Sequence, residues 1–148
     1  MLGGKVNIKK LDERAVIPTC GTKLSAGADL YAVLDDDVII APGETVFVRT
    51  GLAIEIPEGY AGMIFARSGL ACKKGLAPAN KVGVVDADYR GEVMVAVHNH
   101  SLEDRVIGHG ERIAQLVIMP FYKAEFCEVS ELTDTFRGEG GFGSTGEK

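Results

Sequence analysis

The stretch of sequence that decides the fold is residues 37–66, which read DVIIAPGETVFVRTGLAIEIPEGYAGMIFA. It contains three runs rich in β-branched and aromatic residues, separated by Pro-Gly and Pro-Glu-Gly: 37–41, 45–56 and 61–66. Short runs of this composition between turn formers are typical of β-strands, because proline and glycine interrupt regular structure. This stretch therefore predicts several short strands joined by tight turns.

The same pattern continues on both sides of this stretch, at residues 6–11, 29–33, 92–99, 105–107, 113–121 and 124–129. No long window has a convincing helical periodicity. The best helix candidate is 68–74, with Ser68 as its N-cap and Gly75 as its stop. Many short strands at regular spacing favour a sandwich or barrel. We predict an all-β fold, a distorted jelly roll or β-barrel with one short helix.

The length of the chain predicts one domain followed by an arm. At 148 residues the chain can bury one substantial core. The last predicted strand ends near residue 130, and the remainder is rich in glycine. We therefore expect a jelly-roll domain over residues 1–130 and a flexible C-terminal arm over residues 131–148. An arm of this length can reach a neighbouring subunit.

Composition and charge exclude several classes of protein. The chain has no apolar stretch that approaches the length of a membrane span, and no signal peptide at its start. Its three cysteines are odd in number and form no CxxC pair, which favours free thiols in a reducing compartment. The net charge of −5 disfavours a nucleic-acid binder that works through a basic surface. We expect a cytoplasmic protein that binds neither nucleic acid nor membrane.

The arm carries RGEGGFGSTG at residues 137–146, where five glycines surround one aromatic ring. Glycine offers no side chain to pack and loses the most backbone freedom on ordering, so this segment cannot build a core. It suits a strip that closes over a ligand. Arg137 can bind a phosphate, backbone N–H groups can wrap an anion, and Phe142 can stack on a flat ring. A disordered glycine-rich tail is the alternative.

A second constellation, GVVDADYRGEV at residues 83–93, places a polar turn between two β-rich runs. We interpret it as a hairpin with Asp86, Asp88 and Tyr89 at its tip. A carboxylate is ionised at neutral pH and can accept a proton from a water molecule that a nearby cation polarises. An ordinary hairpin turn would also use aspartate and glycine, but it does not require the tyrosine.

Further motifs place polar groups beside predicted strands. In ARSGLA, residues 66–71, an arginine, a hydroxyl and free N–H groups at a helix N-terminus suit an anion, although an ordinary N-cap with a surface arginine looks the same. In GERIAQLVI, residues 110–118, Gln115 lies in an apolar strand and must be hydrogen-bonded to structure or to ligand. In AGADLYA, Asp29 begins a strand and can serve as a turn carboxylate.

Taken together and in this order, these motifs resemble the homotrimeric dUTPase family, the deoxyuridine triphosphate nucleotidohydrolases, over nearly the whole chain. The resemblance implies a homotrimer of jelly-roll subunits with active sites at the subunit interfaces. It implies hydrolysis of dUTP to dUMP and pyrophosphate, with Mg²⁺ bound to the triphosphate. Such an enzyme keeps uracil out of DNA and supplies dUMP for thymidylate synthesis.

The resemblance also implies roles for individual residues. Asp86 matches the general base that activates the water attacking the α-phosphorus. Tyr89 matches the ring packed under the deoxyribose, where a 2′-hydroxyl would clash. Backbone from Gly83 to Val85, with Asn80 beside it, would read the uracil edge and leave no space for a 5-methyl group.

The remaining contacts implied by the resemblance concern the triphosphate and the arm. The phosphates would be bound by Arg67, Ser68, Gly69 and Gln115. Asp29 would be structural, or would reach the metal through water. The arm of another subunit would lay Phe142 over uracil. Further arm contacts, mostly with the β- and γ-phosphates, would be Arg137, Gly143, Ser144 and Thr145.

The closest alternative is the related dCTP deaminase family, which shares the fold and converts cytosine to uracil. Those enzymes use a glutamate on the strand after the hairpin as a proton shuttle, and Ala96 stands where we expect it. That substitution disfavours deamination. A nucleotide-binding regulatory trimer without catalysis is a second alternative, which the presence of Asp86 weakens. One departure from the dUTPase pattern is Ala66, where the family commonly has proline.

Overall fold

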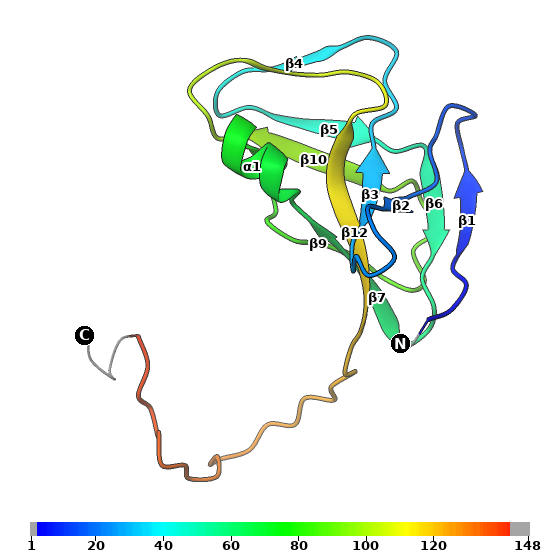
Figure 1. The fold of residues 1–148 in the computed structure, drawn as a ribbon. Helices are drawn as coiled ribbons and strands as arrows, with labels where there is room; N and C mark the ends of the chain where they lie inside the picture. The colour runs from blue at the N-terminus through cyan, green and yellow to red at the C-terminus, as the bar shows by residue number, and fades with distance from the viewer. Residues whose placement is uncertain (1–2, 143–148) are drawn as a thin grey trace.

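The computed structural model describes residues 3–142, which form many short strands and one short helix (Figure 1). The strands are β1 (Asn7–Lys10), β2 (Thr19–Cys20), β3 (Ala28–Tyr31), β4 (Val38–Ile40), β5 (Thr45–Arg49), β6 (Leu52–Glu55), β7 (Tyr60–Phe65), β8 (Leu76–Pro78), β9 (Gly83–Val85), β10 (Met94–Asn99), β11 (Arg105–Ile107) and β12 (Arg112–Pro120). The helix is α1 (Ser68–Lys74). The predicted all-β class with one short helix is confirmed.

The strands of this region pair into four antiparallel sheets around one core. Their strand orders are β2-β3-β12-β7-β9, β5-β10-β8, β1-β6 and β11-β4. Each sheet contributes side chains that are fully buried in one cluster, among them Leu30, Ile40, Leu52 and Val97. Burial of apolar side chains shared by all the sheets is the main force that holds them together. The result is a closed jelly-roll body.

The long β-rich run at 45–56 is two strands, and Gly51 separates them. Gly51 has φ +67°, a left-handed conformation that residues with a Cβ rarely adopt. A Cβ at this position would also lie 2.9 Å from Cβ of Ala15. The preceding Thr50 is fully buried, and its hydroxyl donates to the Val93 carbonyl oxygen. The chain therefore turns here from one sheet into another.

The predicted helix at 68–74 is confirmed, but its N-cap is one residue earlier than expected. Arg67 occupies the N-cap position in an extended conformation, and no side chain caps the helix. The helix therefore begins at Ser68, and Arg67 is the last extended residue before it. The Arg67 guanidinium binds Asp29. Gly75 ends the helix in the left-handed conformation, as predicted. Within residues 3–142, no helix is long and apolar enough to span a membrane.

The segment predicted as a hairpin at 83–93 is instead a connection between two sheets. β9 pairs with β7, whereas β10 pairs with β5 and β8. Residues 86–93, the crossover connection, therefore carry the chain from the five-stranded sheet to the three-stranded sheet. The hairpin prediction was wrong because two β-rich runs around a polar turn look the same whether or not they pair with each other.

After β12 the described chain leaves the body as an extended segment, residues 121–142 (Figure 1). It contains no strand, so the strand predicted at 124–129 is not formed. A strand needs a neighbour for its backbone hydrogen bonds, and no strand in residues 3–142 pairs with this segment. The side chains of Phe126 and Phe136 are fully solvent-exposed. The segment therefore presents apolar surface that nothing in the described part of its own chain covers.

Candidate active site

Five of the predicted site residues line one hollow of about 370 Å³, which we call the tyrosine hollow. These residues are Asn80, Gly83, Val85, Asp86 and Tyr89. They come from β9, from the turn before it and from the crossover connection. Strands β5 and β10 complete the wall with Phe47, Met94 and Ala96. The structure therefore brings together the residues expected to bind the nucleoside and activate water.

Tyr89 is folded back over the end of the crossover connection. Its hydroxyl donates to the Glu92 carbonyl oxygen at 3.0 Å, and its N–H donates to the Asp86 carbonyl oxygen at 3.2 Å. A Cβ on Gly91 would overlap the Tyr89 hydroxyl oxygen. Gly91 therefore allows the ring to take this position. It was not among the predicted site residues, although its place two residues after the tyrosine is a local signal for it.

The Asp86 side chain is exposed at the rim of this hollow. Within residues 3–142, no hydrogen bond or ion pair engages its carboxylate. Both oxygens are therefore available to accept hydrogen bonds from a water molecule, as a general base requires.

Asn80 is held against Gly83 by a tight turn. The Lys81 N–H donates to the Pro78 carbonyl oxygen at 3.0 Å, and Lys81 takes φ +65°, an uncommon conformation for a residue with a side chain. A Cβ on Gly83 would lie 3.4 Å from the Asn80 amide nitrogen. The absence of a side chain at Gly83 lets the β9 backbone lie close to this amide. Amide and backbone can together present donors and acceptors to the edge of a base.

A second set of predicted residues lines another hollow of about 490 Å³, which we call the arginine hollow. These residues are Asp29, Arg67, Ser68, Gly69 and Gln115. Arg112 also lines it. Two guanidinium groups, a hydroxyl and the start of α1 suit a polyanion.

Asp29 lies between the two arginines of this hollow. Arg67 Nε donates to Oδ1 of Asp29 at 2.8 Å, and Arg112 Nη1 donates to Oδ2 at 3.3 Å. The Asp29 side chain is only 15% exposed. Both carboxylate oxygens are thus engaged by guanidinium groups, which the carboxylate holds side by side. Within residues 3–142 there is no group of three acidic, histidine or cysteine side chains that could hold a metal ion.

Gln115 is fixed by its own chain. Its amide nitrogen donates to the Ala66 carbonyl oxygen at 2.9 Å, so the half-buried amide is hydrogen-bonded to the structure. A Cβ on Gly27 would overlap Oε1 of Gln115, so only glycine leaves room for the amide here. Gln115 therefore links β12 to the segment before α1 and closes one side of the hollow.

The contribution of Arg112 was missed by sequence reasoning. Residues three apart on a regular strand point to opposite faces, so regular strand geometry would not bring Arg112 to the side of Gln115. The pairing of β12 with β3 shifts register between Arg112 and Ala114. This irregularity brings Arg112 to the same Asp29 that pairs with Gln115. A bulge of this kind leaves no clear sequence signal.

The two hollows are separate and share no lining residue. Residues of β9, β10 and the crossover connection line most of the tyrosine hollow, whereas residues of β3, β12 and the start of α1 line the arginine hollow. A single chain therefore does not gather all of the predicted site residues into one cavity.

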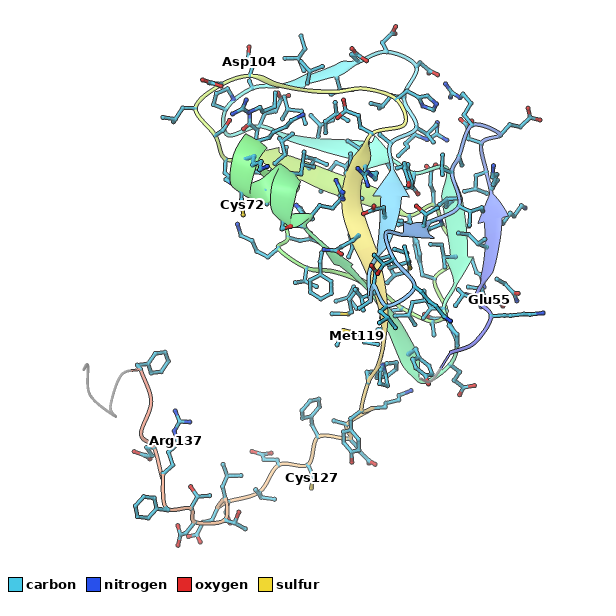
Figure 2. The ribbon with its side chains drawn as sticks, viewed as in Figure 1. Glu55, Cys72, Asp104, Met119, Cys127 and Arg137 are labelled. Carbon is cyan, nitrogen blue, oxygen red and sulfur yellow. The ribbon has the colours of Figure 1, made fainter. Side chains whose placement is uncertain are left out.

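The described arm residues stay away from both hollows. Figure 2 shows Arg137 far from the body of the molecule, and its Nε donates to the Gly140 carbonyl oxygen at 2.7 Å. Phe142 is fully exposed. Neither residue lines either hollow. The predicted contacts Gly143, Ser144 and Thr145 lie outside the described residues.

The chain matches the dUTPase family model over residues 13–146. The deoxyuridine 5′-triphosphate nucleotidohydrolase of Nautilia profundicola is 53% identical over 143 residues, which covers 97% of this chain and 99% of that protein. The protein of the same name from Hydrogenobaculum is 51% identical over 144 residues, which covers 97% of this chain and 99% of that protein.

Solved structures give the same result. The dUTPase of Staphylococcus bacteriophage 80alpha with dUPNHPP matches with a TM-score of 0.89 and 31% identity, and covers 98% of this chain and 100% of that chain. A mutant dUTPase from phage phi11 of S. aureus, solved to show the coordination of a structural Mg(II) ion, matches with a TM-score of 0.80 and 26% identity. That match covers 88% of this chain and 100% of the phage chain.

Proposed function

The chain belongs to the dUTPase family and hydrolyses dUTP, and we propose that it does so at sites formed where copies of the chain meet. In this proposal a water molecule attacks the α-phosphorus, and dUMP and pyrophosphate leave. Removal of dUTP keeps uracil out of DNA, and the dUMP supplies thymidylate synthesis. We further propose a cytoplasmic location, because the exposed cysteines Cys20, Cys72 and Cys127 are free thiols, as expected in a reducing compartment.

The observation that carries the shared site is the separation of the two hollows. The tyrosine hollow offers a carboxylate and an aromatic ring, and the arginine hollow offers guanidinium groups. A nucleoside triphosphate needs both kinds of contact along one molecule. Since the two hollows are separate within one chain, we infer that the tyrosine hollow of one copy meets the arginine hollow of another. A closed homotrimer satisfies this condition with equivalent interfaces.

The tyrosine hollow performs the nucleoside recognition and the proton transfer. The Asp86 carboxylate accepts a proton from the attacking water as the oxygen of that water bonds to the α-phosphorus. The Tyr89 ring packs under the sugar and leaves no room for a 2′-hydroxyl. Asn80 and the backbone from Gly83 to Val85 bind the uracil edge.

The arginine hollow binds the phosphates. Arg67 and Gln115 contact phosphate oxygens together with Ser68 and Gly69 at the start of α1. Asp29 acts by holding Arg67 in place, as its 2.8 Å bond to Nε indicates. Because the cations are already fixed, they stabilise charge on the leaving pyrophosphate without reorganising.

We propose that Mg²⁺ binds together with the substrate, on its phosphates. The described residues offer no cluster of three ligands, and both oxygens of Asp29 are engaged by arginines. Mg²⁺ commonly keeps several waters and binds through phosphate oxygens with few protein ligands. Bound to the triphosphate, it would neutralise part of the phosphate charge, with Asp29 reaching it at most through water.

The arm completes the site from another copy. We propose that residues 131–148 cross to a neighbouring subunit, where Phe142 covers the uracil. Arg137, Gly143, Ser144 and Thr145 then close over the phosphates. The extended, exposed course of residues 121–142 supports an arm that reaches away from its own body. Closure would exclude water other than the attacking molecule.

The deaminase alternative is not favoured. Ala96 lines the tyrosine hollow, and a methyl group there cannot move a proton. The curated relatives are also named as nucleotidohydrolases. A substrate panel of dUTP, dTTP, dCTP and UTP tests the point, with pyrophosphate and ammonia release measured in parallel. We expect pyrophosphate from dUTP and little from the others, and ammonia from dCTP would contradict this result.

A complementation experiment tests the shared site. Asp86→Asn and Arg67→Ala each disable one hollow, so each variant alone should have little activity. If one copy supplies Asp86 and another supplies Arg67, co-expressed variants form mixed trimers in which some sites have both residues intact. We expect activity to return in the mixed trimers. Mixed trimers that stay inactive, with a trimer mass confirmed by light scattering, would show that both residues act within one chain.

A further inference from the structure

We propose that Arg49 and Glu92 are positioning residues for Tyr89, and that through the tyrosine they set the preference for deoxyribose over ribose. This inference rests on the role proposed above for the Tyr89 ring. Neither Arg49 nor Glu92 belongs to the predicted site, and Arg49 does not line the tyrosine hollow.

Arg49 binds the Glu92 carboxylate through two of its nitrogens. Arg49 Nε lies 3.2 and 3.1 Å from the two Glu92 carboxylate oxygens, and Nη2 lies 3.1 Å from Oε1. The Glu92 side chain is 18% exposed, so this pair is screened less than an ordinary surface pair. The hydrogen bonds with Glu92 raise the pKa of Arg49. Charge-assisted contacts of this geometry fix both partners more firmly than a single-point ion pair.

The same arginine is supported on its other side. Its Nη1 lies 3.8 Å from Oδ2 of Asp12, and Asp12 in turn binds Arg14 at 2.8 Å. The guanidinium of Arg49 is therefore shared between two carboxylates. That arrangement argues against a direct role in binding the phosphates of the substrate, because the charge of the arginine is already neutralised.

The backbone beyond Glu92 is also tied to the strand that carries Arg49. Arg49 pairs with Met94 across the β5–β10 ladder. The buried Thr50 hydroxyl donates to the Val93 carbonyl oxygen, and the Val93 N–H donates to the Leu52 carbonyl oxygen at 2.8 Å. The end of the crossover connection is thus fixed to β5 and β6, and the Arg49–Glu92 pair adds a side-chain tie at Glu92 itself. Closer to the tyrosine, the exposed Arg90 also binds Glu55 of β6 at 3.3 Å.

Tyr89 depends on this fixed end. Its hydroxyl donates to the Glu92 carbonyl oxygen at 3.0 Å, and its side chain has no other hydrogen bond within residues 3–142. The residue is 45% exposed, so packing alone does not hold the ring. If the side chain of Glu92 is released, its carbonyl oxygen is less well placed and the ring gains freedom. A looser ring excludes a 2′-hydroxyl less strictly, whereas Asp86 keeps its own exposed position.

The test measures kcat and KM for dUTP and UTP in the intact enzyme. Glu92→Gln and Arg49→Ala break the pair from its two ends, so a folding defect in one variant leaves the other informative. We expect the ratio of kcat/KM for dUTP to that for UTP to fall about tenfold in both. The kcat for dUTP should change by less than about threefold. Glu103→Gln is the matched control, because it removes an equivalent charge from the exposed pair with Arg105 and should leave the ratio unchanged.

Two tyrosine variants separate this inference from the proposed function. Tyr89→Ala should abolish most of the discrimination, and if it leaves the ratio unchanged, the proposed role of the ring fails. If Tyr89→Ala lowers the ratio but both pair variants leave it intact, the positioning role is overturned. Tyr89→Phe removes the bond to Glu92, so Glu92→Gln should add little to it in the double variant. Full additivity, or an equal loss of kcat for both nucleotides in Glu92→Gln, would assign Glu92 a different role.

Discussion

The tyrosine hollow and the arginine hollow differ in how their acidic residues are engaged. Asp86 in the first has no partner in the described chain, whereas Asp29 in the second lies between Arg67 and Arg112. A carboxylate that is already paired is a poor proton acceptor, and one that is free cannot hold an arginine in place. The proposed division, with proton transfer in the tyrosine hollow and phosphate binding in the arginine hollow, is consistent with this difference.

The two hollows have one feature in common. In each, a glycine leaves room for a polar side chain to pack against the backbone. Gly91 leaves room for the Tyr89 hydroxyl, and Gly27 leaves room for the Gln115 amide. In both cases a Cβ would lie well inside contact distance of a side-chain end rather than of backbone. Substitution should therefore displace the functional group more than it disturbs the fold.

The largest effect is expected for Asp86→Asn, which tests whether the free carboxylate of the tyrosine hollow is the general base. The amide keeps the size of the side chain but cannot act as a base, so kcat for dUTP should fall by about 10³-fold or more. Affinity for a non-hydrolysable dUTP analogue should stay close to that of the native enzyme. Pyrophosphate release and calorimetric binding measure the two effects. Near-native turnover would contradict the assignment of Asp86 as the general base.

Deletion of residues 137–148 tests whether the two hollows suffice without the arm. The hollows are formed by residues up to 117, so the truncated chain should fold and keep its oligomeric mass. We expect kcat/KM to fall about 100-fold, because the lid that excludes water is lost. Steady-state kinetics and light scattering check both parts. An unchanged rate would reject closure by the arm.

Gly91→Ala should affect the tyrosine hollow alone. The added Cβ overlaps the Tyr89 hydroxyl, so the exposed ring must swing away. We expect the preference for dUTP over UTP to fall about tenfold with a smaller change in thermal stability. Parallel kinetics with the two nucleotides measure the preference. A variant that unfolds instead would show that this glycine serves the fold.

Gly27→Ala is the counterpart in the arginine hollow. The added Cβ overlaps Oε1 of Gln115, so the amide must turn and its bond to Ala66 weakens. We expect KM for dUTP to rise about fivefold, while the preference for dUTP over UTP stays unchanged. The opposite pattern, lost preference at constant KM, would contradict the division of labour between the hollows.

The smallest expected effect is on acid stability and concerns Asp12, which pairs with Arg14 and Arg49. Hydrogen bonds from Arg14, first through its side chain and then its backbone, hold the pKa of Asp12 well below its usual range. A lowered pKa stabilises the folded state above the unfolded value of about 4, and this contribution is lost as pH falls toward the folded value. Urea unfolding between neutral and acidic pH should show a shallower decline for Asp12→Asn. An unchanged slope would assign acid sensitivity to other groups.

Local sequence predicted the elements of the body well. The helix at 68–74 and most strands follow from composition and turn residues, and Gly75 ends the helix where expected. The pairing partners could not be predicted, because the run at 83–93 looks like a hairpin whether its strands meet or join different sheets. The predicted strand at 124–129 has no partner in the described part of its own chain, which a single sequence does not reveal.

The candidate site shows the same limit. The sequence named most of the polar residues of both hollows, but their separation into two hollows depends on tertiary structure. Arg112 joins Asp29 through an irregularity in β12, and Gly91 matters through the way Tyr89 folds back. Such contacts depend on strand register and on the direction of side chains in the folded chain. The spacing of residues within a motif does not predict them.

If each site takes its two hollows from different copies, as proposed, catalysis depends on enzyme concentration as well as on nucleotide concentration. Dilution below the concentration at which the subunits dissociate should abolish activity even when dUTP is saturating. A compound that prevents neighbouring subunits from associating would then inhibit the enzyme without resembling a nucleotide.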